Sequence, residues 1–294
     1  MKIRTRKKCQ AMSVMIPFSI YYFGLMLVPM VMLFYYSFTD LSITYGTEQW
    51  VGWENYIHIF EWREYLESLG ITFLMGLFLL VIGFIASFGT AVLLKSITRA
   101  ASLYRTIWYI PTLLSMAVVS QILNILLRQD GALNAIIGFF GAEPIIWHNS
   151  TFWMYFWIIF LNTWKGMGGT VLIFLSALQS ISPDIYEAAN IDGANRRTTF
   201  FRITIPLIRP MIGFVLITGG IGAFNIYEPV LLISGGGPDQ TTSVILYRIY
   251  QEAFFNFKQG FASALSVVVL IIVMAFTVLS MKVTDSSLLT GKEA

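Results

Sequence analysis

Charged residues and cysteine are both scarce in this chain. Asp, Glu, Lys and Arg make up 12% of its 294 residues, whereas hydrophobic residues make up 56%. Soluble domains carry about 25% charged residues, so this composition excludes a soluble globular protein and predicts an all-α, polytopic membrane protein. The single cysteine, Cys9, excludes an intrachain disulfide and leaves the redox compartment undetermined.

Residue patterns that carry chemistry are missing as well. The sequence has no paired carboxylates, no cluster of metal-ligating residues and no Ser/His nucleophile arrangement, which argues against a membrane-embedded enzyme. It has no internal repeat and no second well-supported carboxylate near the bilayer midplane. These absences argue against an ion-coupled secondary transporter, which stays open as the alternative function.

Six stretches are long and apolar enough to cross about 30 Å of hydrocarbon. We predict spans at residues 12–38, 66–94, 106–127, 152–180, 207–233 and 260–281. The first stretch is longer than the core of a signal peptide and lacks a small-residue cleavage site, which favours a first membrane helix. The chain then divides into a basic N-terminus at 1–11, a six-helix transmembrane domain at 12–281 and a C-terminal tail at 282–294.

The distribution of Lys and Arg predicts which side of the membrane each loop faces, because cytoplasmic loops hold the excess of these residues. If both termini are cytoplasmic, 14 of the 19 Lys and Arg residues lie in cytoplasmic segments. The opposite, outer segment at residues 39–67 carries six acidic residues and one Arg. We therefore expect cytoplasmic termini and a cytoplasmic loop at 181–206.

The loop at 181–206 is a polar island between two long apolar stretches. Ser182 as N-cap, Pro183 at the first helical position and Asp184 against the positive helix end predict the start of a short helix. On that helix Ile185, Ala188 and Ala189 share one face of small residues that a partner surface could approach.

The second half of the same loop predicts a turn and a further helix. Gly193 can supply a backbone turn unavailable to most residues. Asn195 can cap a second short helix, and Pro206 and Pro210 mark the beginning of the fifth span.

Taken in order, the residues of this loop resemble the EAA loop of ATP-binding-cassette (ABC) importer permeases. The matching residues are Glu187, Ala188, Ala189, Asp192, Gly193, Ala194, Phe200, Ile203, Pro206 and Pro210. Ile205 departs from the Leu that commonly precedes the proline, a change of similar volume. The resemblance implies a coupling helix that docks into a cleft of an ATP-hydrolysing subunit, with Glu187 and Asp192 in polar contacts and Gly193 at the bend.

A second region resembles the carbohydrate-uptake branch of these permeases, the maltose, lactose and glycerol-3-phosphate type. Its acidic residue is Glu228, and a turn at Gly236, Gly237 and Pro238 follows, before an amphipathic helix that ends in Ala253-Phe254. The glycine-rich run is not followed by Gly-Lys-Ser or Gly-Lys-Thr, which excludes a nucleotide-binding loop there. The turn faces outward, and by resemblance that surface receives a binding protein.

The resemblance implies a transmembrane permease subunit that forms half of a heterodimeric pore for a sugar or oligosaccharide in the bacterial plasma (inner) membrane. Its partners would be a second homologous permease, two nucleotide-binding ATPase subunits, an extracellular or periplasmic solute-binding protein, the carbohydrate and membrane lipid, with no nucleic acid. The chain itself would bind no cofactor and no metal and would catalyse nothing, because ATP and Mg would be held by the ATPase subunits.

Substrate contacts are expected where polar and aromatic residues occur together inside a span, since ionisable side chains there are costly and sugars need hydrogen-bond partners and an aromatic face. Two such clusters occur, Asn162, Trp164 and Lys165 in the fourth span and Asn225, Tyr227 and Glu228 near the outer end of the fifth. Structural alternatives are an ion pair between spans, a snorkelling Lys165, and packing or interfacial anchoring for the others.

Overall fold

The computed structural model describes residues 2–97 and 101–283, so the expected C-terminal tail lies outside the described residues from residue 284 onward. Regular structure in the described ranges is helical, apart from two isolated β-bridges, Thr39 with Trp50 and Ser42 with Thr47. The expectation of an all-α membrane protein is confirmed. The described chain forms two compact units, one comprising the residues up to Arg63 with Ile249–Ile271, the other Glu64–Arg248 with the residues from Ile272 on.

The first unit contains α1 (Lys2–Tyr36), α2 (Glu54–Glu61) and the adjoining parts of α11 (Ile245–Phe254) and α12 (Gln259–Val283). A buried amide organises the hairpin after α1, because the Asn55 side chain donates hydrogen bonds of 2.9 Å to the carbonyls of Ser37 and Thr39. Every turn of α1 from Met15 to Tyr36 is apolar and unburied, which is typical of a helix whose surroundings are lipid or another chain.

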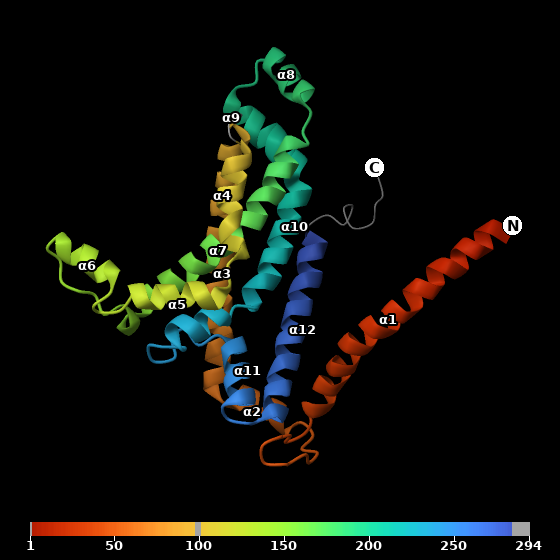
Figure 1. The fold of residues 1–294 in the computed structure, drawn as a ribbon, viewed down its shortest axis with the longest axis vertical. Coiled ribbons are helices and arrows are strands. Elements are labelled where there is room, and N and C mark those ends of the chain that lie inside the picture. Colours follow the sequence, from red (N-terminus) through yellow and green to blue (C-terminus); the bar gives the residue numbers. More distant parts are fainter. Residues whose placement is uncertain (1, 98–100, 284–294) are drawn as a thin grey trace. The chain divides into compact units, whose positions relative to one another are not determined.

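The second unit holds most of the helices (Figure 1). They are α3 (Arg63–Lys95), α4 (Ala101–Leu113), α5 (Met116–Leu126), α6 (Ala132–Phe139), the 3₁₀ turn η1 (Trp147–Asn149), α7 (Thr151–Gln179), α8 (Pro183–Ile191), α9 (Arg196–Thr199), the π-helix η2 (Phe200–Thr204), α10 (Ile205–Phe224) and the π-helix η3 (Val230–Ser234). Within this unit α4 lies along α7, with the Thr112 hydroxyl donating to the Lys165 carbonyl at 3.0 Å.

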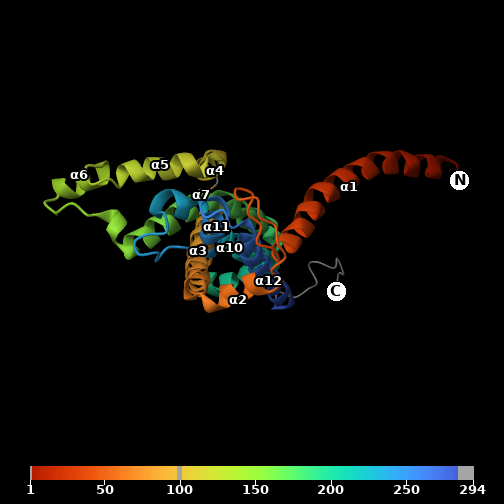
Figure 2. The ribbon, with the colours of Figure 1, turned by 90° about the horizontal axis from the view of Figure 1, so that it is seen from below.

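Five helices of the described chain are long and apolar enough to span a membrane, and a sixth span exists only if a bent pair counts as one. The expected third span at 106–127 is present only as a bent pair, because the chain bends by 88° between residues 102–113 and Met116–Leu126. Ser115 has an extended ψ of 135° and begins α5 as its N-cap. In both views α5 and α6 extend sideways from α4 and α7 (Figures 1 and 2).

The expected bounds of the fifth span, 207–233, are wrong. A continuous helical stretch runs from Arg196 to Phe224, and Asn225 ends it. Pro229 cannot donate a hydrogen bond to a preceding carbonyl, so it lies at the beginning of the next helical segment and not inside the same helix. Asn225, Tyr227 and Glu228 therefore follow the span, on the connection to η3, and do not lie within it.

Candidate functional site

The loop between α7 and α10 folds locally as its residues predict. The Ser182 hydroxyl accepts from the Asp184 N–H at 3.3 Å, and Pro183 occupies the first turn of α8. Gly193 adopts a φ of +77°, which a side chain would disfavour, and turns the chain between α8 and α9. The Asn195 side chain then accepts from the Thr198 N–H at 2.8 Å and caps α9. Both short helices and the glycine turn are confirmed.

The expected face of α8 comprises Ile185, Ala188 and Ala189, and Ala189 is the one of these residues that is not accessible. Ala189 is only 6% exposed and faces the body of its own chain. Glu187, Ala188 and Asp192 are exposed, and Ile191 at the C-terminal end of α8 is 86% exposed. The surface that a partner can reach therefore combines a carboxylate at each end with small and apolar side chains between them. Ala189, in contrast, sets how closely α8 lies against the rest of the chain.

Two further residues matched to the EAA loop, Ala194 and Pro206, follow this helix in the chain. The Ala194 N–H donates to the Ala189 carbonyl at 2.9 Å, which closes the turn after α8. Pro206 lies exposed in the first turn of α10, directly after the π-helix η2.

Tyr186 ties α8 to the helices beside it, a role that the motif comparison does not single out. Its hydroxyl accepts a 2.8 Å hydrogen bond from Lys95 Nζ at the end of α3 and lies 3.3 Å from Thr204 Oγ1 in η2. The Lys95 ammonium also lies 4.3 Å from the centroid of the Tyr186 ring. Helical spacing in the sequence could have indicated this role, because Tyr186 and Ala189 are three residues apart and therefore lie on the same face of α8, the face turned toward its own chain.

The structure separates the three polar candidates on α7. Asn162 lines a cavity between α3, α7 and α10, whereas Trp164 packs against a buried apolar cluster and Lys165 does not line the cavity. The interpretation of Lys165 and Glu228 as an ion pair between spans is wrong, because within the described chain these two residues form no ion pair with each other. Glu228 is exposed beyond the end of α10.

The cavity beside Asn162 has a volume of about 330 Å³ and lies between α3, α7 and α10. Its polar lining comprises Ser87, Asn162, Thr163, Thr170 and Thr218. The Thr163 hydroxyl is buried and makes no hydrogen bond to any described residue. Such a group is costly unless something polar reaches it, so this cavity suits a ligand rich in hydroxyl groups.

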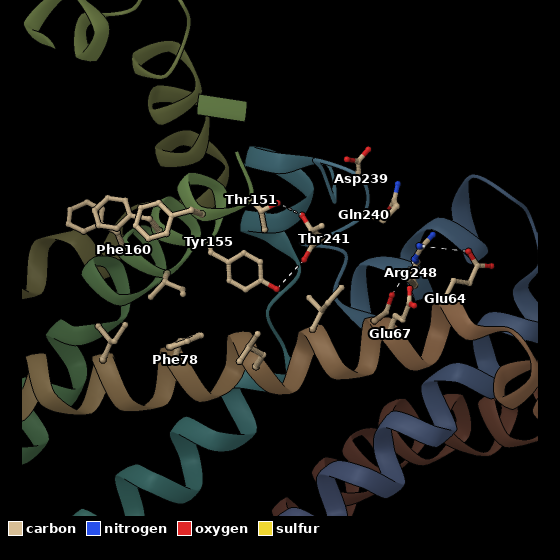
Figure 3. A pocket seen from close by; sticks show the side chains of 17 residues that line it. Glu64, Glu67, Phe78, Thr151, Tyr155, Phe160, Asp239, Gln240, Thr241 and Arg248 are labelled. Carbon is tan, nitrogen blue, oxygen red and sulfur yellow. Dashed lines mark hydrogen bonds and ion pairs between the residues drawn. The ribbon is translucent and has the colours of Figure 1, made fainter. Parts of the chain in front are cut away.

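A larger cavity of about 920 Å³ lies between the N-terminal halves of α3 and α7 (Figure 3). Aliphatic and phenyl side chains such as Phe78 and Phe160 form much of its wall. Polar residues line the α7 side, at Thr151 and Tyr155, and also the opposite end, where Arg248 Nη2 lies 3.8 Å from Glu64 Oε2. Most of the surface that faces the cavity is nonetheless apolar, and the Tyr155 hydroxyl already donates to the Thr241 carbonyl at 3.0 Å. This cavity therefore suits an apolar body better than a carbohydrate.

The turn after η3 is built on glycine and is held by a hydrogen bond from Tyr247. Gly235 and Gly236 have φ values of 58° and 84°, and the Tyr247 hydroxyl donates to the Gly235 carbonyl at 2.9 Å. A side chain at Gly236 would place its Cβ 2.8 Å from the Tyr247 ring. The expected turn at Gly236, Gly237 and Pro238 and the amphipathic helix after it, α11, are confirmed.

Comparison with known proteins gives the family. The family described as binding-protein-dependent transport system inner membrane component matches residues 98–287. The probable ABC transporter permease protein YesP of Bacillus subtilis is 33% identical over 92% of this chain and 88% of its own length. The sn-glycerol-3-phosphate transport system permease protein UgpA of Escherichia coli is 31% identical over 86% of each chain.

A solved structure has the same fold, a chain of a bacterial ABC transporter involved in the import of the acidic polysaccharide alginate. It is 23% identical, superposes with a TM-score of 0.83, and the match covers 95% of this chain and 98% of that one. The family match and these relatives together identify the polytopic chain as a member of the inner membrane components of binding-protein-dependent ABC transport systems, permease subunits of the multi-pass membrane type.

Proposed function

We propose that this chain is a transmembrane permease subunit of an ATP-driven importer of a sugar or oligosaccharide. The observation that carries the proposal is α8, a capped helix between two spans whose Glu187 and Ile191 are exposed and whose only buried residue is Ala189. A helix so little covered by its own chain is suited to bind another subunit. The carbohydrate class is supported by relatives named for sn-glycerol-3-phosphate transport and alginate import.

The proposed assembly contains a second homologous permease, two nucleotide-binding subunits that hold ATP and Mg, and a solute-binding protein on the outer side. Closure of the nucleotide-binding subunits would move α8 as a rigid body, because the helix is capped by Ser182 at its beginning and ends at the Gly193 turn. The movement would then reach α7 and α10, the helices that α8 connects. In this scheme Glu187 and Asp192 make polar contacts to the nucleotide-binding subunit, and Ala188 allows close approach.

We further propose that the plasma (inner) membrane is crossed with both termini and α8 on the cytoplasmic side. The support is the excess of Lys and Arg in the segments that this orientation makes cytoplasmic. The turn at Gly236, Gly237 and Pro238 would then lie outside and present the surface for the solute-binding protein.

ATP dependence separates this function from an ion-coupled secondary transporter. In proteoliposomes that contain the whole complex, uptake should require ATP, and ionophores should leave the uptake unchanged. The ATP should be needed on the side of the membrane from which an impermeant maleimide reacts with the Asn190→Cys variant. Glu187→Arg should abolish this uptake, because a like or unpaired charge in a docking interface costs several kcal/mol. Uptake driven by an ion gradient without ATP would contradict the proposal.

We propose the cavity of about 330 Å³ beside Asn162 as the part of the pathway that contacts the sugar. Its volume is at the lower end of the range for small-molecule sites, about 300–1,000 Å³. Hydroxyl and amide groups converge on it from α3, α7 and α10, and Thr163 Oγ1 offers an unused hydrogen bond. Trp164, Lys165, Asn225, Tyr227 and Glu228 stay proposed contributors that a substrate would have to meet elsewhere along the pathway.

Thr163→Val and Asn162→Leu test this cavity. Each keeps approximately the side-chain volume and removes a polar group, so uptake at low substrate concentration should fall about two- to ten-fold through one lost hydrogen bond. Thr277→Val is the matched control, since the Thr277 hydroxyl donates to the Val273 carbonyl of its own helix at 2.7 Å. Concentration dependence of uptake identical to wild type in both cavity variants would exclude the cavity as a sugar contact.

A further inference from the structure

We propose that Tyr186 is a positioning residue that passes movement of α8 to two membrane helices at once, α3 and α10. The inference rests on the proposed function of α8 as the helix that binds the ATPase subunit. Tyr186 lies next to Glu187 in the chain but points the other way, toward its own subunit, where its hydroxyl meets Lys95 and Thr204. One side chain thus joins three elements that are 91 and 18 residues apart in sequence.

The contact with α3 is a charge-assisted hydrogen bond with a specific geometry. Lys95 lies in the last turn of α3, where a cation is favoured by the negative end of the helix. Its ammonium donates to the Tyr186 hydroxyl at 2.8 Å and lies 4.3 Å from the ring centroid. The cation therefore contacts the hydroxyl and also lies within the range of a cation–π contact to the ring, so a shift of Tyr186 cannot leave Lys95 unaffected.

The contact with α10 reaches a π-helical turn. Because Lys95 donates to the Tyr186 oxygen, the phenolic proton is free to be donated to Thr204 Oγ1, 3.3 Å away. The Thr204 hydroxyl at the end of η2 in turn donates to the carbonyl of Thr199, the last residue of α9, at 3.3 Å. Thr204 is buried, and the chain of donors runs in one direction from Lys95 across η2 to the Thr199 carbonyl.

A π-helical turn is suited to respond to a movement of Tyr186. It contains one residue more than an α-helical turn, is less regular, and occurs mostly at functional sites. Here it lies between α9 and the membrane helix α10, within the continuous stretch Arg196–Phe224. A pull on Thr204 would therefore act on the first turn of a span without breaking the helix.

No other side chain of α8 can substitute for Tyr186. Within the described part of the chain, the remaining side-chain hydrogen bond of α8 is the local cap between Asp184 and Ser182. Ala189, the buried residue of the helix, has only a methyl group to offer. Tyr186 accordingly carries the polar attachment of α8 to its own subunit.

The test uses the full complex with its ATPase subunits and binding protein, and measures substrate transported per ATP hydrolysed. Tyr186→Phe keeps the ring and removes the hydroxyl, Lys95→Met removes the cation, and Tyr104→Phe on the exposed face of α4 is the matched control. Tyr186→Phe and Lys95→Met should each lower the transport-to-ATP ratio about two- to thirty-fold, the range for residues that carry coupling between sites. The double variant should be no worse than the more severe single one, because both break one connection.

Two results would overturn the role of Tyr186. One is a wild-type ratio in both single variants. The other is a fall of uptake and ATP hydrolysis in equal proportion, which is the signature of lost folding and not of lost coupling. Thr204→Val, which leaves Lys95 and Tyr186 in place, checks the same connection at its other end. Failure of the proposed function itself gives a different result, since wild-type protein would then show no ATP-dependent uptake.

Discussion

Gly193→Val should abolish substrate uptake while the protein is still inserted in the membrane at close to normal amounts. Gly193 has a φ of +77°, a conformation that costs a β-branched residue about 1–3 kcal/mol. Relief of that strain would straighten the turn between α8 and α9 and change the direction in which α8 points. Uptake and ATP hydrolysis in reconstituted complexes measure the result, and we expect hydrolysis to persist without transport.

Two matched variants separate backbone strain from other causes. A Cβ at Gly193 meets no atom within 4 Å, so a steric clash is not involved. Gly193→Asn should retain most uptake because Asn tolerates this backbone region. Gly141 has a φ of +81° and equally open surroundings in another loop, so Gly141→Val imposes the same strain away from α8. Equal loss of uptake in Gly141→Val and Gly193→Val would contradict the role of the α8 turn.

Gly168→Ala should sharply reduce the amount of folded protein. The added Cβ would collide with the Trp108 backbone carbonyl and lie 2.7 Å from Thr112 Oγ1, at the place where α4 crosses α7. Backbone atoms cannot move aside as a flexible side chain can, so α4 would have to separate from α7, at a cost of about 1–3 kcal/mol. Detergent-solubilised yield and thermal stability measured by size-exclusion chromatography would report the loss.

The neighbouring glycine provides the control. A Cβ at Gly169 meets nothing within 4 Å, so Gly169→Ala adds the same methyl group one residue further along α7 without a collision. Alanine is about 1 kcal/mol more favourable than glycine within a helix, so this variant should be as stable as wild type or more so. If Gly168→Ala and Gly169→Ala behave alike, close packing of α4 on α7 is not what Gly168 provides.

The local structure of the coupling region was readable from the residues because its determinants are short-range. Ser182 as a cap, Pro183 at the first helical position and Gly193 at positive φ act through atoms a few residues away. The same reasoning was sufficient for Asn195 and for the glycine turn before α11. Five of the six expected spans overlap single apolar helices, since about 20 apolar residues are needed to cross a bilayer, and the third overlaps the bent pair.

The sequence did not reveal where helices break within an apolar run. Hydropathy gives the length of an apolar run but not whether one helix continues through it. The 88° bend before Met116 lies between two apolar helices and therefore left no trace in the hydropathy. For the same reason the fifth span was placed too late, with Glu228 inside it. The true bounds of the fifth span depend on the cap at Asn195 and on Pro229. Hydropathy does not register such residues, because caps and prolines occur in polar and in apolar segments alike.

By itself the sequence determined a polytopic helical membrane protein with an exposed loop at 181–206 and a glycine turn before α11, because composition, caps and turns act locally. Tertiary structure alone decided which polar residues line the same cavity or form hydrogen bonds with each other. It directs Asn162 and Thr163 into one cavity and Lys165 away from it, buries Ala189, and joins Tyr186 to Lys95 and Thr204. Such meetings depend on how helices distant in sequence pack and rotate against each other, which no local pattern encodes.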